Sequence, residues 1–331
     1  MDCKNFPEDV KLALSQNESL QLASRSIELS HYDVSNPHLY RHDEFENAAS
    51  LLSDSTFDRL RGFPTFGNDY GTLVLKNLPV DPFLPQTPPD GRRPPEKLSV
   101  SESVAALIGC LIGDIFSYGD EKEGLLIQNI CPVRGQEQQQ ENTGSVFLEF
   151  HTEDSFHPMP PDLLMLTCLR GDRTGQALTA TASMTRALRV LDAEIVEILM
   201  QPRFIIRSSQ SFGASVYTRR VSILSGTGHD RRFIFDPVGM RATDEDSEAA
   251  MQRLHAALSE QTYGFCLQPG EAIVIDNRKA CHARTRFTPF YDGYDRWLQR
   301  IFLTQRFSDY NCILTQGTRM VDPVKAREIA A

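Results

Sequence analysis

The chain has 331 residues, 40% hydrophobic and 24% charged, which is the usage of a globular protein with a sizeable core. Its net charge of −10 and the absence of a Lys and Arg run argue against nucleic acid or an anionic membrane as partner, so the expected ligand is a small molecule. The N-terminus lacks the apolar region of a secretory signal, and the longest apolar stretch, residues 104–113, is too short to cross a bilayer, so we expect a cytoplasmic protein.

The first part of the chain is predicted to be mostly helical. Apolar positions recur at helical spacing in residues 7–27 and again in residues 101–118. Between them, residues 70–80 have the composition of a strand. We expect a single domain, with residues 1–69 forming an N-terminal helical extension.

Two loops flank the next predicted strand. Residues 82–95 are too rich in proline for regular structure and predict a surface loop. A buried strand over 124–131 then leads into a polar, glutamine-rich segment. Residues 132–146 are therefore predicted to be a mobile loop or a lid over a site, with an ordinary polar insert as an equal alternative.

Short strand-like runs dominate the rest of the chain. They span residues 163–168, 177–182, 203–207, 216–224, 232–236, 271–276 and 297–307. Two helices interrupt them, at 184–200 and 243–261, and Thr243 with Asp246 resembles a capping box at the start of the second. This pattern predicts a mainly β fold with flanking helices, built on a double-stranded β-helix or jelly roll.

A candidate metal site begins at His151 and Glu153. In an extended segment, side chains at i and i+2 point to the same side, so both can bind one ion. His282 follows an apolar strand and could complete the site. Two His and one carboxylate with open positions are typical of non-haem iron(II) oxygenases, although an HxE tripeptide alone is weak evidence.

Two arginines after His282 support a ligand-binding site near the metal candidates. Arg296 and Arg300 lie in a strand-like run beyond His282, and their even spacing places both on one face. A guanidinium is a bidentate partner for carboxylates, so two of them near a metal indicate two carboxylate-bearing small molecules. Surface salt bridges with the many acidic residues are the alternative reading.

The sequence resembles a known family in two segments, FHTEDSFHPMPPDLLMLTCLRGD and IDNRKACHARTRFTPFYDGYDRWLQRIF. Both are similar to the clavaminate synthase-like oxygenases, a branch of the taurine dioxygenase superfamily that includes the arginine hydroxylase of viomycin biosynthesis. A weaker likeness covers most of the chain from about Tyr70.

The resemblance implies a role for each matching residue. It makes His151, Glu153 and His282 the Fe(II) ligands, and it makes Arg296, assisted by Thr179, the partner of the distal carboxylate of 2-oxoglutarate. Two further residues would bind the substrate. Arg300 matches an arginine that holds its α-carboxylate, and Gln128 matches a glutamine that contacts its α-amino group together with Glu153.

The substrate side chain is less well defined. In family members that act on basic amino acids, acidic residues bind the cationic end, and the matching regions here contain Ser209, Ser211 and Asp236. Only Asp236 carries a negative charge. A lysine or arginine substrate is therefore less strongly indicated, and a neutral polar amino acid is the main alternative substrate.

The activity that the resemblance implies is hydroxylation of an unactivated carbon, C3 or C4, of a free L-amino acid. Dioxygen and 2-oxoglutarate are consumed, and succinate and CO2 are released. Desaturation or ring closure with the same cofactors is an alternative. A zinc-dependent hydrolase would leave both arginines unexplained, and a non-catalytic binding protein would leave the complete ligand set unexplained.

Other histidines and the cysteines are expected to have structural roles. His157 matches the family but would crowd the open metal positions, so we expect it to pack or hydrogen bond in its loop. The seven scattered cysteines form no CxxC pair and are predicted to be free thiols. Cys281 lies beside His282, where oxidation is conceivable but a catalytic role is not indicated.

Overall fold

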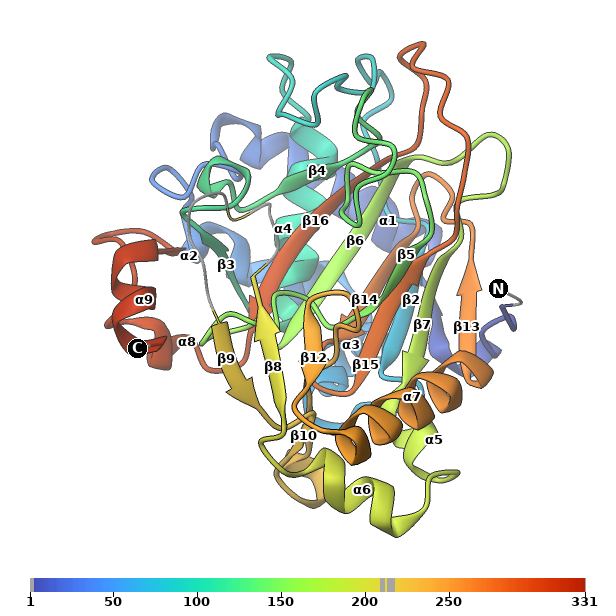
Figure 1. The fold of residues 1–331 in the computed structure, drawn as a ribbon. Coiled ribbons are helices and arrows are strands. Elements are labelled where there is room, and N and C mark those ends of the chain that lie inside the picture. The colour runs from blue at the N-terminus through green and yellow to red at the C-terminus, as the bar shows by residue number, and fades with distance from the viewer. Residues whose placement is uncertain (1–2, 209–211, 213–217, 331) are drawn as a thin grey trace.

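The computed structural model describes residues 3–208, 212 and 218–330, which fold around two facing β-sheets (Figure 1). The larger sheet has the strand order β1-β2-β14-β6-β16-β3-β17, and β4 also pairs with β16. Its strands are β1 (Lys11–Ala13), β2 (Thr72–Lys76), β3 (Asp114–Tyr118), β4 (Gln128–Ile130), β6 (Leu163–Arg170), β14 (Ala272–Asp276), β16 (Trp297–Thr304) and β17 (Met320–Val321).

The smaller sheet is antiparallel, with the strand order β13-β7-β15-β5. Its strands are β5 (Leu148–His151), β7 (Thr179–Ser183), β13 (Thr262–Phe265) and β15 (Ala280–Arg284). The two sheets pack face to face, and the hydroxyl oxygens of Thr72 in β2 and Thr181 in β7 lie 3.0 Å apart.

Five short strands form two further sheets. One has the order β12-β8-β9, and the other pairs β10 with β11. Their bounds are β8 (Phe204–Arg207), β9 (Thr218–Val221), β10 (Leu224–Ser225), β11 (Arg232–Phe233) and β12 (Met240–Ala242).

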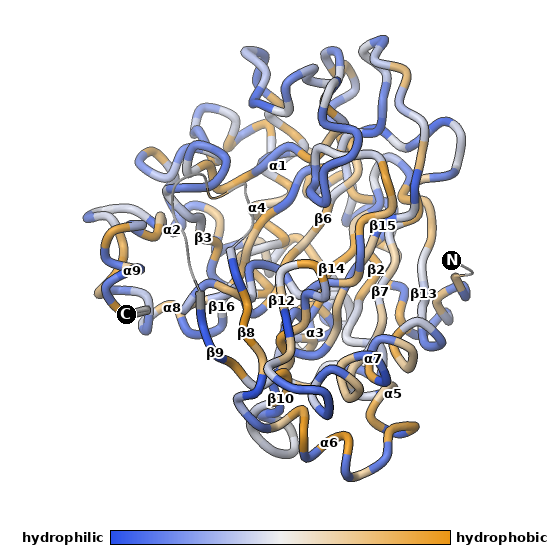
Figure 2. Tube along the Cα trace, in the orientation of Figure 1, coloured by the Kyte–Doolittle hydropathy of each residue, from blue (hydrophilic) through white to orange (hydrophobic). Residues whose placement is uncertain are grey.

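Strand β6 shows why the larger sheet is buried on both faces. Successive side chains of a strand point to opposite sides, so Leu164 and Leu166 enter the core between the sheets, while Leu163 and Met165 pack under the helices. Figure 2 shows the central elements as largely hydrophobic and the outer loops as largely hydrophilic. The predicted mainly β fold with flanking helices is confirmed.

The helices cover the outer faces of the two sheets. Helices α1 (Gln16–Glu28), α3 (Asp54–Phe66) and α4 (Ser99–Ile112) pack on the larger sheet, and α7 (Glu245–Glu260) lies across the smaller one (Figure 1). The remaining helices are α2 (His42–Phe45), α5 (Met184–Leu188), α6 (Ala193–Leu199), α8 (Phe307–Tyr310) and α9 (Pro323–Ala330).

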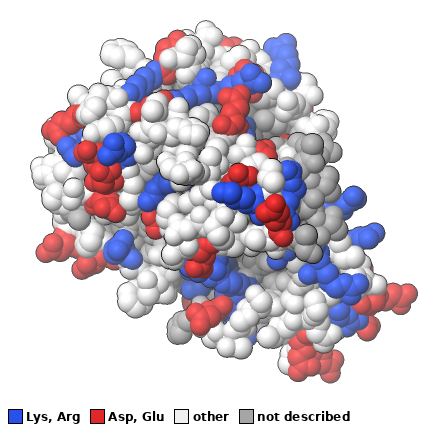
Figure 3. Space-filling model, turned by 90° about the vertical axis from the view of Figure 1, so that its left-hand side faces the viewer, with Lys and Arg blue, Asp and Glu red and all other residues white. Residues whose placement is uncertain are grey.

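Neither the helices of the described residues nor the charge on one face of the surface stands out. None of the helices in the described ranges is long and apolar enough to cross a membrane. On the face shown in Figure 3, acidic and basic side chains are interspersed.

The two predicted N-terminal helices are shorter than expected. Residues Glu8–Val10 form a 3-10 turn, and Lys11–Ala13 pair in parallel with β2, so α1 begins only after Ser15. The helix predicted over 101–118 ends at Ile112, and the chain continues as β3, which pairs with β16. In both cases sheet pairing overrides the helical periodicity.

Later predictions also need correction. The helix predicted over 184–200 is divided into α5 and α6, and the cap of α7 is Asp244 rather than Thr243, because the Asp244 side chain accepts from the Ser247 N–H. The strand predicted over 216–224 is divided in its described part, and residues 216 and 217 lie outside the described residues. The strand predicted over 297–307 ends at Thr304.

Candidate metal and ligand-binding site

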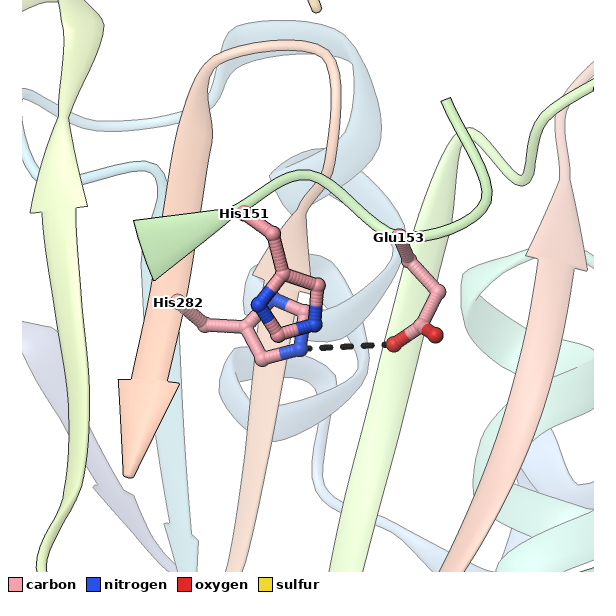
Figure 4. Close-up of side chains that lie close together, drawn as sticks. All are labelled: His151, Glu153 and His282. Carbon is pink, nitrogen blue, oxygen red and sulfur yellow. Dashed lines mark ion pairs between the residues drawn. The ribbon is translucent and has the colours of Figure 1, made fainter. Parts of the chain in front are cut away.

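Strand pairing in the smaller sheet brings the two histidines of the candidate metal site together. His151, the last residue of β5, is the register partner of His282 in β15, and their ring centroids are 4.2 Å apart. Glu153 follows two residues after His151, and its Oε2 lies 3.3 Å from Nε2 of His282 (Figure 4). Ligand atoms of all three residues lie within 4.8 Å of one another, so they could hold one ion.

Neighbouring backbone and amide groups fix this arrangement. Nδ1 of His151 lies 2.8 Å from the carbonyl oxygen of Glu149, which favours the tautomer that leaves Nε2 free for a metal. The Asn277 side chain accepts from the Glu153 N–H at 2.7 Å and donates to the Glu153 carbonyl at 3.0 Å. Asn277 therefore anchors the backbone that carries the candidate carboxylate ligand.

The charge states suit a divalent metal. Burial, together with the nearby His151, lowers the pKa of His282 to about 4, so the imidazole is neutral at neutral pH. Burial alone would raise the pKa of Glu153, but the Arg300 and His282 partners hold it well below its usual range. Two imidazoles and one carboxylate form a donor set that fits iron(II).

Arg300, in the middle of β16, lies among carboxylates. Its Nη1 donates to Oε1 of Glu153 at 2.7 Å, and its Nη2 donates to Oε1 of Glu121. Its Nε donates to Oε1 of Gln128 at 3.0 Å. Asp154 is also buried nearby, and burial together with the charges of Glu121 and Glu153 raises its pKa well above the usual value.

Arg296 lies in different surroundings. Its side chain is 6% exposed, and its Nη2 donates to Oγ1 of Thr179 at 3.3 Å. Within the described ranges it has no carboxylate in ion-pair distance, and burial lowers its pKa. A buried guanidinium without an anionic partner is costly, so this end of the site fits an anionic ligand such as the distal carboxylate of 2-oxoglutarate.

These residues line one cavity of about 600 Å³, a size ordinary for a small-molecule site. Its walls include the metal candidates, Thr179, Arg296, Arg300 and Asp236. They also include residues of the polar segment predicted as a loop or lid, namely Gln139, Gln140, Glu141 and Asn142.

Of the other predicted substrate-binding residues, only some line the cavity. Gln128 is not among the cavity-lining residues and instead accepts from Arg300. Asp236 lies at the cavity wall, where its Oδ1 accepts from the backbone N–H groups of Val238 and Gly239. Ser209 and Ser211 lie outside the described residues.

His157 and Cys281 lie beside the site without joining the group of candidate metal ligands. His157 is buried, and its Nδ1 lies 3.0 Å from the backbone nitrogen of Met159. The Cys281 thiol donates to the Ala182 carbonyl at 3.5 Å, and burial raises its pKa. A buried thiol of raised pKa is a poor nucleophile.

Glu121 is the main site residue that the sequence analysis missed. It is 2% exposed, lines the cavity, and its Oε2 has no hydrogen-bond partner in the described part of the chain. It lies in the polar run GDEKEG, which resembles an ordinary surface turn. The expectation that a carboxylate pairs with the ammonium group of an amino-acid substrate is the signal that could have indicated Glu121.

Comparisons with known proteins place the chain among amino-acid oxygenases in sequence and fold. The L-asparagine oxygenase of Streptomyces coelicolor is 37% identical over 246 residues, which are 74% of this chain and 74% of the relative. A structure of asparagine oxygenase with Fe(II), 2S,3S-3-hydroxyasparagine and succinate has a TM-score of 0.89 and 31% identity, covering 94% of this chain and 99% of that one.

A second solved structure extends the likeness. The non-heme iron oxygenase OrfP in complex with Fe and alpha-ketoglutaric acid has a TM-score of 0.81 and 27% identity, covering 94% of this chain and 99% of that one. The profile described as taurine catabolism dioxygenase TauD, TfdA family matches residues 44–302. The predicted resemblance is thus confirmed, and the chain belongs to the TauD/TfdA dioxygenase family.

Proposed function

We propose that this protein is an iron(II)- and 2-oxoglutarate-dependent dioxygenase that hydroxylates C3 or C4 of a free L-amino acid and releases succinate and CO2. One observation carries the proposal. The His151, Glu153 and His282 group lines a cavity that also contains two arginines: Arg300 is flanked by carboxylates, and Arg296 has no carboxylate partner among the residues that the structure describes.

The proposed metal and co-substrate site consists of the three candidate ligands and the residues around Arg296. His151, Glu153 and His282 would hold iron(II), and Arg296 with Thr179 would hold the distal carboxylate of 2-oxoglutarate. The bound metal and co-substrate would supply, from dioxygen, the oxidant needed to attack an unactivated carbon. The protein contributes a buried, preorganised site that fixes both groups in place.

The amino-acid backbone of the substrate would lie at Arg300 and Glu121. Arg300 supplies the guanidinium for an α-carboxylate. Oε2 of Glu121, which has no hydrogen-bond partner among the described residues, supplies an acceptor for an α-ammonium group. Gln128, which we predicted to contact the α-amino group, offers its oxygen to Arg300 instead. We therefore infer that Gln128 orients Arg300.

A neutral polar side chain suits the rest of the cavity better than a basic one. Asp236 lines the wall, but its Oδ1 is already used by two backbone N–H groups, and Arg207 places a positive charge on the same cavity. A lysine or arginine side chain would meet that charge. A carboxamide can both accept from a guanidinium and donate to a carboxylate, so asparagine or glutamine is the favoured class.

A screen of free amino acids tests this proposal. The protein is incubated with iron(II), 2-oxoglutarate, dioxygen and single amino acids, while succinate release and product mass are measured together. We expect carboxamide amino acids to give stoichiometric succinate and a product heavier by one oxygen atom. A product lighter by two hydrogens would indicate desaturation or ring closure, and succinate release with basic amino acids alone would overturn the substrate class.

A further inference from the structure

Arg284 is a cavity residue for which the proposed function has given no role so far. It is the last residue of β15, two positions after His282, so both side chains lie on the same side of the strand. Its register partner in β7 is Thr179, the residue that accepts from Arg296. Arg284 is 4% exposed and lines the cavity with Arg296.

Within the described ranges, the contacts of Arg284 include no anionic partner. Its Nη2 donates to the Val146 carbonyl at 2.8 Å, and its guanidinium lies 5.1 Å from the Phe287 ring centroid. Its buried Nε has no hydrogen-bond partner among the described residues, and no carboxylate of those residues forms an ion pair with it. Arg284 and Arg296 thus place two neighbouring positive charges at the same end of the cavity.

Arg284 also contacts the polar segment that borders the cavity. Val146 belongs to residues 137–147, of which Gln139, Gln140 and Glu141 line the cavity. The backbone N–H of Phe287 donates to the Ser145 carbonyl at 3.1 Å, next to the Arg284 contact. Arg284 is therefore in a position to connect an anion in the cavity to the segment 137–147.

We propose that Arg284 is a second cation of the co-substrate site, which binds the distal carboxylate of 2-oxoglutarate together with Arg296 and holds the segment 137–147 against the site through Val146. The inference rests on the proposed function and deepens it. A carboxylate has enough lone pairs for two guanidinium groups, and its negative charge offsets the repulsion between them.

Binding of two 2-oxo acids to the anaerobic iron(II) protein tests the first part of this inference. The probes are 2-oxoglutarate and 2-oxopentanoate, which has the same chain length and no distal carboxylate. We expect Arg284→Met to weaken 2-oxoglutarate binding by at least about tenfold and to leave 2-oxopentanoate binding little changed. Arg286→Met, at an exposed position two residues later, is the matched control and should change neither.

Hydrogen exchange of residues 137–147 tests the second part. Addition of 2-oxoglutarate should slow exchange in the parent protein but not in Arg284→Met, and Arg284→Lys, which keeps the charge, should retain part of the affinity. Equal weakening of both probes, or no weakening, would overturn the inference while the proposed function stands. Failure of the parent protein to bind 2-oxoglutarate would overturn both.

Discussion

The two ends of the cavity carry opposite charge imbalances. Around Arg300, the buried carboxylates of Glu121 and Glu153 outnumber a single guanidinium. At the other end, Arg296 and Arg284 have no carboxylate partner in the described part of the chain. Because unpaired buried charges are costly, each end is suited to ligands of the opposite sign.

This contrast accounts for the chemistry that we propose. A divalent metal and a substrate ammonium group would offset the excess of carboxylates at the Arg300 end. A dicarboxylate co-substrate, chelated at the metal, would offset the excess of guanidinium groups at the Arg296 end. The two ends of one cavity can therefore bind two different carboxylate-bearing molecules, the co-substrate at one end and the substrate at the other.

The largest expected effect is the loss of the metal. His282→Ala removes one of the three candidate ligands, and we expect turnover below about one hundredth of the parent, because even changes to groups behind metal ligands cost 10 to 100-fold. Iron content measured after anaerobic loading should fall with it. His38→Ala, at an exposed position, is the control and should retain iron, and full iron occupancy in His282→Ala would remove His282 from the ligand set.

The charge imbalance itself can be tested by the stability of the ligand-free protein. Arg300→Met leaves Glu121 and Glu153 without their cation and should lower the free energy of unfolding by about 3 to 5 kcal/mol. Arg296→Met removes a cation for which the described residues offer no carboxylate partner, so it should leave stability unchanged or raise it. Urea unfolding of both variants measures the difference, and equal destabilisation would contradict the contrast between the two ends.

A smaller effect on substrate binding is expected at Glu121. Glu121→Gln keeps the shape of the side chain but removes the charge that we assign to the α-ammonium group. We expect the KM for the amino acid to rise about tenfold while the KM for 2-oxoglutarate stays near the parent value. An increase confined to 2-oxoglutarate would place Glu121 at the wrong end of the cavity.

The smallest effect concerns a buried carboxylate that needs no ligand. Glu18 accepts from the N–H and hydroxyl groups of Ser15 and Ser53, and although burial alone would raise its pKa, these bonds lower it to about 2. We expect Glu18→Gln to cost about 1 kcal/mol at neutral pH, the usual contribution of a helix cap.

The pH dependence of this cost has a defined sign. Because the pKa of Glu18 is lower in the folded state, its contribution is present above the ordinary value of 4.5 and is lost as the pH falls towards about 2. The difference in unfolding free energy between parent and Glu18→Gln should therefore shrink over that range. A difference that is constant with pH would show that the carboxylate charge is not involved.

The sequence was informative where a side chain's role follows from local spacing or from the family resemblance. His151 and Glu153, two residues apart, both lie in the metal-ligand group, as the spacing predicts. The even spacing of Arg296 and Arg300 is a weaker guide, because Arg296 precedes β16 and the strand has a register irregularity between Trp297 and Leu298. The pairing of His151 with His282 depends on the register of β5 and β15. That register is a tertiary property, and only the resemblance indicated it.

The failures have physical causes as well. Residues 11–13 and 114–118 fit a helical pattern, but each segment gains hydrogen bonds by joining the larger sheet. Glu121 was missed because burial of a carboxylate in a polar turn leaves no periodic signal. Arg284 was missed because its position next to Arg296 depends on the pairing of β15 with β7.

The most direct test of the account is the visible absorption of the anaerobic protein with iron(II) and 2-oxoglutarate. We predict the weak charge-transfer band of a chelated ferrous site, and we predict that Arg296→Gln will need about 100-fold more 2-oxoglutarate to reach it, because a buried charge pair is lost. Absence of the band in the folded parent protein, or an unchanged 2-oxoglutarate requirement in Arg296→Gln, would contradict the account.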